Sequence, residues 1–141
     1  MSRAFLSAVL GFVLFAGCHG PKGSPEGTVE SFYSAAESHD WEAMAGMIHP
    51  DSMRKVGPPP RVAAFYAAIY EHCNDVDVSI EESLITRPDA EAVVRFKCTA
   101  TFRALGQQAY ERSCSDTISL RTHNGKWYIV LTETQPLRPT L

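Results

Sequence analysis

The sequence has no excess of positive charge. Its 141 residues include 13 Lys and Arg against 16 Asp and Glu, which gives a formal net charge of −3 at pH 7. No segment carries the cluster of basic residues with which proteins hold the phosphate backbone of nucleic acids. The composition therefore predicts no nucleic-acid partner. A hydrophobic fraction of 45% with 21% charged residues predicts one ordinary globular domain.

The motifs of the common enzyme classes are missing as well. The sequence contains no GxSxG, HExxH, P-loop or dinucleotide-binding pattern. It also has no CxxC pair, and His72-Cys73 lacks the spacing of two metal ligands. We therefore expect neither a metal site nor a cofactor, and any activity has to come from residues that only the fold brings together.

Long hydrophobic runs are absent too. The apolar stretch over residues 4–16 is interrupted only by Ser7 and Gly11. As a helix it would rise about 20 Å, which is short of the roughly 30 Å hydrocarbon core of a membrane. Because it follows Arg3, a run of this length is typical of the central region of a secretory signal peptide rather than of a membrane span.

The run ends in small residues followed by a cysteine, Leu14-Phe15-Ala16-Gly17-Cys18. This segment resembles the lipobox of bacterial lipoproteins, although Phe15 stands where that motif usually has Leu. The resemblance implies that residues 1–17 are a signal peptide and that Cys18 carries a lipid anchor built from fatty acids such as palmitate. An ordinary signal peptide cut nearby is the alternative, and it would leave Cys18 free to pair elsewhere.

The implied anchor also sets the expected location and domain layout. His19 is not the Asp that retains enteric lipoproteins in the inner membrane. The resemblance therefore implies a bacterial cell-envelope protein on the periplasmic face of the outer membrane rather than in the inner membrane. Residues 18–24 contain Gly and Pro and are expected to form a flexible tether. A single domain is expected over residues 25–135.

The spacing of apolar residues predicts helices first and strands afterwards. Helical spacing extends over residues 25–38, 41–48 and 61–73, and Ser24-Pro25 is a typical capped start. After Asn74 the apolar residues alternate with polar ones, as in strands with one buried face. Asn124-Gly125 favours a tight turn between the last two strands. Four strands are expected, around residues 76–80, 94–102, 110–120 and 127–131.

The predicted fold class is α+β, with N-terminal helices packed on one face of a curved, four-stranded antiparallel meander. This order resembles the nuclear-transport-factor-2-like fold, a cystatin-like cone shared by ketosteroid isomerases and SnoaL-like polyketide cyclases. The resemblance rests on residues 25–33 (PEGTVESFY), 40–44 (DWEAM) and 124–130 (NGKWYIV). It implies a pocket that is either occupied by a ligand or filled by side chains. The family usually has an early strand between its second and third helices, for which residues 53–56 are a poor candidate.

Strand register also predicts how the cysteines pair. If the lipid takes Cys18, then Cys73, Cys98 and Cys114 remain, in an envelope that is oxidising. A hairpin that turns around Gly106 sets position 98 opposite position 114, with both on the apolar face. The register therefore predicts a Cys98–Cys114 disulfide and leaves Cys73 as the odd thiol. Three reduced, buried cysteines are the alternative.

The same register places acidic residues on the inward, apolar face. The two turns set Asp116 opposite Phe96 on one side and Glu133 on the other, and setting Leu84 opposite Val94 brings Glu82 opposite Phe96. An inward carboxylate beside apolar side chains is a candidate general base. A bulge at Glu81-Glu82, or a slip by one residue, would turn these side chains to solvent. The candidate pocket residues are Tyr33, Glu82, Phe96, Asp116 and Glu133.

These observations favour a non-catalytic, membrane-anchored lipoprotein whose domain binds a small apolar ligand or an envelope protein. An isomerase- or cyclase-like enzyme that uses an inward carboxylate is one alternative. A scaffold that forms a weak homodimer through the outer face of the sheet is another. That face is too polar for an obligate interface and includes Lys97 and Tyr128.

Overall fold

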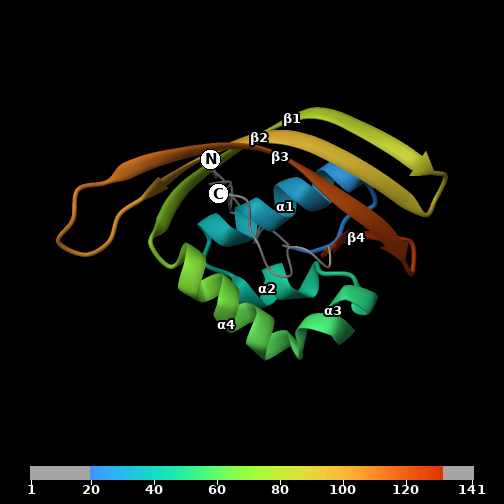
Figure 1. Ribbon diagram of the computed structural model, residues 1–141, viewed down its shortest axis with the longest axis horizontal. Coiled ribbons are helices and arrows are strands. Elements are labelled where there is room, and N and C mark those ends of the chain that lie inside the picture. Colours follow the sequence, from blue (N-terminus) through green and yellow to red (C-terminus); the bar gives the residue numbers. More distant parts are fainter. Residues whose placement is uncertain (1–19, 132–141) are drawn as a thin grey trace, which may run out of the picture.

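The chain folds into two layers, with a long curved sheet lying over a layer of helices (Figure 1). The computed structural model describes residues 20–131. The sheet order is β1-β2-β3-β4 and every neighbouring pair is antiparallel, so the predicted α+β meander and cone-shaped fold are confirmed. Within the described residues the elements are α1 (Pro25–Glu37), α2 (Trp41–Gly46), α3 (Pro50–Val56), α4 (Pro59–Tyr70), β1 (Cys73–Arg87), β2 (Glu91–Phe102), β3 (Tyr110–His123) and β4 (Lys126–Val130).

Local capping explains where the first two helices begin. The Ser24 hydroxyl accepts a hydrogen bond from the backbone N–H of Gly27 at 3.1 Å, and Pro25 occupies the first turn, where a missing N–H costs nothing. The Asp40 carboxylate accepts from the N–H of Ala43 at 3.0 Å. Both predicted starts are confirmed. None of the described helices is long and apolar enough to span a membrane.

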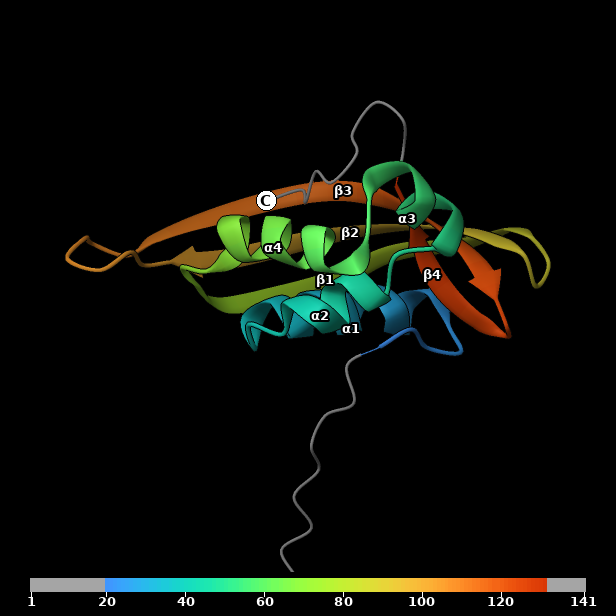
Figure 2. The ribbon, with the colours of Figure 1, turned by 90° about the horizontal axis from the view of Figure 1, so that it is seen from below.

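Helix α3 was not expected from the sequence. It lies where the family usually has an early strand. Strand pairing in this region consists of a single parallel bridge between Ile48 and Ile129. The N–H of His49 donates to the carbonyl of Ile129 at 2.8 Å, and the N–H of Ile129 donates to the carbonyl of Met47 at 2.8 Å. These bonds attach the start of α3 to β4, at the edge of the sheet (Figure 2).

Helix α4 begins and ends earlier than predicted. It starts at Pro59, because a proline fits the first helical turn. The preceding Pro58 lies outside the helix and has an extended backbone with φ −67° and ψ 155°. It ends at Tyr70 rather than at residue 73, because the chain has already entered β1 at Cys73. Only residues 71 and 72 therefore separate the helix from the first strand.

The register of the sheet agrees with the prediction on one side and departs from it on the other. Cys98 faces Cys114, Phe96 faces Asp116, and Leu120 faces Ile129, as predicted. Between β1 and β2 the prediction was wrong, since a bulge between Ile80 and Glu82 sets Ile80 opposite Phe96 and Glu82 opposite Arg95. The bulge lies at Glu81-Glu82, where a bulge was the alternative expected from the sequence.

Alternation along β2 builds the core. Every second residue from Ala92 to Phe102 is buried, and the residues between them face the other side of the sheet. Opposite them, α1 and α4 contribute apolar and aromatic side chains. The largest of the fully buried side chains are Tyr33, Tyr66, Tyr70, Phe96, Met44, Met47 and Leu120.

Candidate functional site

Aromatic rings fill the interior between the helices and the sheet. Tyr33 of α1 and Phe96 of β2 are 1% and 0% exposed, with ring centroids 5.3 Å apart. Phe32 packs edge-on against Tyr33 at 5.3 Å and against Tyr66 at 5.4 Å. Tyr33 and Phe96, two of the five predicted pocket residues, therefore meet as packing partners in the core.

One polar atom in this interior has no partner. In the described part of the chain, the hydroxyl of Tyr70 is the buried side-chain oxygen that makes no hydrogen bond. Burial raises the pKa of Tyr70 well above its usual value, and the nearby Tyr33 and Tyr66 hydroxyls raise it further. The hydroxyl therefore keeps its proton and is available as a donor to any acceptor that enters the interior.

The three predicted carboxylates do not form one cluster. Glu82 lies on the outer face of the sheet with 57% of its side chain exposed, where its carboxylate is 3.1 Å from the Arg95 guanidinium. Its placement in the pocket was wrong, because the bulge turns its side chain away from the core. Beside it, Lys97 donates a hydrogen bond to Glu81, which lowers the pKa of that carboxyl. Glu133 lies outside the described residues.

Asp116 is the predicted carboxylate that remains on the inward face. It is half-buried, faces Phe96 across the strands, and lies two residues from Cys114 on the same side of β3. No group of three His, Cys, Asp or Glu side chains in residues 20–131 is arranged to hold a metal ion. Asp116 is therefore a single inward acid at the edge of an apolar interior.

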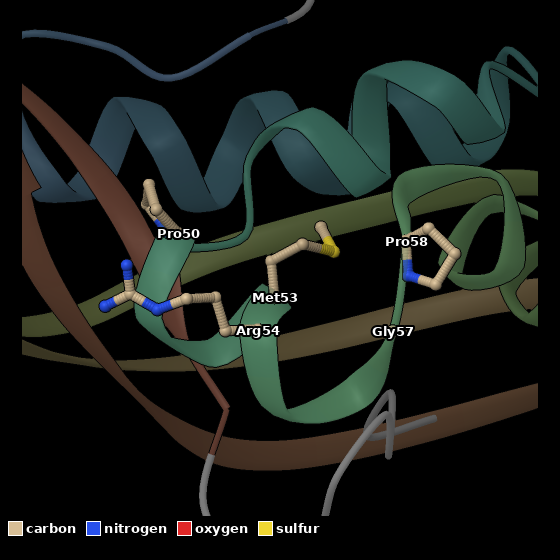
Figure 3. A pocket seen from close by; sticks show the side chains of 5 residues that line it. All are labelled: Pro50, Met53, Arg54, Gly57 and Pro58. Atoms are coloured by element: carbon tan, nitrogen blue, oxygen red, sulfur yellow. The ribbon is translucent and has the colours of Figure 1, made fainter.

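A cleft opens beside α3, on the surface of the molecule. It has a volume of about 480 Å³ and is lined by Pro50, Met53, Arg54, Gly57 and Pro58. Figure 3 shows the Met53 side chain between Pro50 and Pro58, with Arg54 projecting from the same helix at the rim. Gly57 has a φ of 121°, which residues other than glycine rarely adopt, so this position favours glycine.

A second, smaller cleft lies between α2 and α4. Its volume is about 310 Å³, and Glu42, Ala45, Pro59, Pro60 and Ala63 line it. Neither cleft was predicted from the sequence, because both depend on how the chain turns at Gly57 and Pro58 between α3 and α4. The signals that could have located α3 are Pro50 in the first turn with Asp51 beside it and Arg54-Lys55 in the last turn.

Polar contacts hold α3 against the edge of the sheet. His49 is buried, and its Nδ1 accepts a hydrogen bond from the N–H of Asp51 at 3.2 Å. Its ring packs edge-on against His123 at 5.9 Å and Tyr128 at 6.2 Å. Burial lowers the pKa of His49, an effect that the Asp51 carboxylate partly opposes. His49 is therefore held neutral as the cap of α3.

Asp51 also positions the basic side chain of the cleft. Its carboxylate is in contact with the Arg54 guanidinium and lies 3.6 Å from that of Arg121 on β3. Arg54 remains 76% exposed. The cleft thus combines an apolar floor with a guanidinium at its rim, fixed by one carboxylate.

Comparison with protein families identifies the domain. The model of the SnoaL-like domain matches residues 26–133, which is more than half of the chain. The chain belongs to the SnoaL-like family. No curated protein matches the sequence.

Solved structures agree with this fold. A ketosteroid isomerase-like protein from Erwinia carotovora atroseptica is 19% identical, with a TM-score of 0.57 over 74% of this chain and 86% of the other. A putative NTF2-like transpeptidase from Campylobacter jejuni is 19% identical, with a TM-score of 0.51 over 77% and 99%. A putative dehydratase of the NTF2-like family from Streptomyces avermitilis is 15% identical, with a TM-score of 0.51 over 75% and 93%. At these identities the likeness establishes the fold alone.

The SnoaL-like domain brings its three described cysteines close to one another. Cys98 and Cys114 face each other across β2 and β3, and their thiols form a hydrogen bond. All three are free thiols in the structure, so the register behind the predicted Cys98–Cys114 disulfide is confirmed while the bond itself stays a prediction. Burial raises the pKa of Cys73 to about 11, which leaves its thiol protonated and weakly reactive.

Proposed function

We propose that this protein is a non-catalytic binding module of the bacterial cell envelope, held at the membrane by a lipid on Cys18. The apolar run over residues 4–16 and the small residues before Cys18 support the anchor. The SnoaL-like and NTF2-like families include both enzymes and binding modules, so the family alone does not choose between them. The choice between an enzyme and a binding module rests on whether the interior has space for a substrate and on whether the surface has a cleft for a ligand.

The filled interior is the observation that carries the proposal of binding over catalysis. An enzyme of this fold needs space beside its general base for a substrate. Here the ring of Tyr33 packs against Phe96 and that of Phe32 packs against Tyr66 in that space. Glu82 faces solvent on the other side of the sheet. Among residues 20–131, Asp116 is the predicted carboxylate that keeps the inward position required by the enzyme hypothesis.

The cleft beside α3 favours a particular kind of ligand. Met53 and the proline rings offer an apolar surface, while Arg54 offers a guanidinium that pairs well with carboxylates. We infer that the cleft binds an apolar molecule, or an apolar segment of an envelope protein, that carries an acidic group at one end. Pro50 and Pro58 restrict the backbone of the cleft, which lowers the cost of ordering it on binding.

Metabolic labelling tests the anchor. Cells that express the full chain are grown with radioactive palmitate, and the protein is then recovered from separated inner and outer membranes. The label is expected on the wild type and on the Cys73→Ser variant, in the outer membrane, and not on Cys18→Ser. A wild-type protein that carries no label and remains soluble would overturn the anchor while leaving the binding site to be tested separately.

Native mass spectrometry of the full chain, purified in detergent, tests the binding site. A co-purified molecule is expected on the wild type and on Lys97→Glu, a charge reversal on the outer face, and is expected to be lost from Arg54→Glu. An empty wild type would overturn the small-ligand form of the proposal. A dimer that only Lys97→Glu dissociates would support the scaffold instead. A turnover lost in a folded Asp116→Asn variant would establish the enzyme.

A further inference from the structure

The inward face of the sheet carries a pair of thiols at the base of a projecting hairpin. Cys98 of β2 and Cys114 of β3 are direct cross-strand partners. The segment between them, residues 99–113, forms the β2–β3 arm, which extends past the helical layer (Figure 1). Leu105 at its tip is fully exposed. β1 pairs with the arm along residues 99–102, but no described helix covers the tip beyond them.

The two thiols differ in access. Cys98 is 2% exposed and lies in the core beneath the sheet, whereas Cys114 is half-buried and reaches the surface. Burial raises the pKa of both thiols, while the hydrogen bond between them lowers the pKa of Cys114 in part and raises that of Cys98 further. An incoming reagent therefore meets Cys114 first, with Cys98 already in contact behind it.

The third cysteine is nearby but differently engaged. Cys73 is fully buried at the start of β1, where it faces Phe102 rather than another cysteine. Its Sγ lies 3.9 Å from the carbonyl oxygen of Asp75, in a hydrogen bond within its own strand. The strand geometry therefore favours the pair Cys98 and Cys114 over any pair that includes Cys73.

We propose that Cys98 and Cys114 form a reversible disulfide that closes the base of the β2–β3 arm, and that Cys114 is the thiol that exchanges with the oxidant. The proposal is independent of the lipid anchor and of the cleft beside α3. The oxidant is an external disulfide of the glutathione or oxidoreductase class. Cross-strand partners on one face of an antiparallel pair are close enough for such a bond.

The exchange balances in two steps. The Cys114 thiolate attacks one sulfur of the external disulfide, which forms a mixed disulfide and releases the other sulfur as a thiolate that takes up a proton. Cys98 then loses its proton and attacks Cys114 Sγ, which breaks the mixed disulfide and releases the second thiol. Two electrons and two protons pass from the cysteine pair to the external disulfide.

Peptide mapping of the full chain tests the pairing. The purified protein is equilibrated with mixtures of oxidised and reduced glutathione, its free thiols are alkylated, and it is cleaved with trypsin. Cleavage after Lys97, Arg103, Arg112 and Arg121 places Cys98 in residues 98–103 and Cys114 in residues 113–121. These two peptides are expected to be joined under oxidising conditions, in the wild type and in Cys73→Ser, and separated by dithiothreitol. A Cys98 or Cys114 peptide joined to Cys18 or Cys73, or alkylation of both Cys98 and Cys114 in fully oxidised glutathione, would overturn the proposal.

Two single variants test the order of attack. Cys98→Ala leaves Cys114 without its partner, so glutathione is expected to stay attached to Cys114 as a mixed disulfide. Cys114→Ala leaves only the buried Cys98 of the pair, and glutathionylation in the Cys98 peptide is expected to be about tenfold slower or more because access limits it. Equal rates in the two variants would remove Cys114 from its assigned role. The wild-type peptide map does not depend on whether these variants fold.

Discussion

The interior of this SnoaL-like domain and the region around α3 are held together in different ways. Beneath the sheet, aromatic and aliphatic side chains pack at 0 to 6% exposure and leave little freedom. At the edge of the sheet, α3 is attached by two backbone hydrogen bonds, a histidine cap and ion pairs of Asp51, around an open cleft. Changes in the interior should therefore act on stability, and changes around α3 should act mainly on binding and on the response to pH.

The largest effect is expected from removing a ring of the interior. Phe96→Ala deletes a fully buried side chain that contacts Tyr33, and we expect a loss of about 3–5 kcal/mol in the free energy of unfolding. Urea unfolding followed by circular dichroism measures it. The neighbouring Lys97→Ala variant, on the exposed face, is the control and should lose about 1 kcal/mol or less. A small effect at Phe96 would mean that the interior holds space for a ligand after all.

A smaller effect of opposite sign is expected at Tyr70. Its hydroxyl is buried without a partner, which costs about 1–3 kcal/mol. Tyr70→Phe removes only that oxygen, so the free energy of unfolding should rise by up to this amount, as seen in the urea midpoint. Tyr33→Phe is the matched control and should show no such gain, because the Tyr33 hydroxyl is not a buried oxygen without a hydrogen-bond partner. A loss of stability in Tyr70→Phe would show that a water or ligand occupies the interior.

The two regions also differ in how much of their structure could be predicted from the sequence. The register of β2, β3 and β4 follows from two turns, at Gly106 and at Asn124-Gly125, because each glycine has a positive φ that fixes the hairpin. Alternation then assigns Phe96, Cys98, Cys114 and Asp116 to the inward face. These positions are local consequences of turn chemistry and period, so they could be predicted.

The parts that could not be predicted depend on contacts distant in sequence. The bulge between Ile80 and Glu82 inserts one residue at a point where two consecutive residues are acidic, and the pattern of Glu81-Glu82 does not say which of them is extra. Glu82 was therefore assigned to the wrong face. Helix α3 has only seven residues, and its start is held by Ile129, about 80 residues further on.

The response to pH is the mildest test of the contrast and concerns α3 alone. His49 Nδ1 accepts the N–H of Asp51, so protonation of the ring would remove the cap, and burial keeps its pKa below the ordinary value of 6.5. The unfolded chain therefore binds a proton first as the pH falls below 6.5. The free energy of unfolding should decrease through that range and level off below the pKa of the folded state.

The groups that face this ring are Asp51, Arg121, His123 and the backbone of Thr122, and of these Asp51 and the Thr122 hydrogen bond limit the shift. His49→Asn supplies a cap that does not titrate. Its urea midpoint should change less between pH 7.5 and pH 5 than that of the wild type, while the exposed His72→Asn should behave like the wild type. Equal pH dependence in all three proteins would mean that α3 does not depend on a neutral His49. The stabilisation at the edge of the sheet would then come from the backbone bridge to Ile129 and the ion pairs of Asp51.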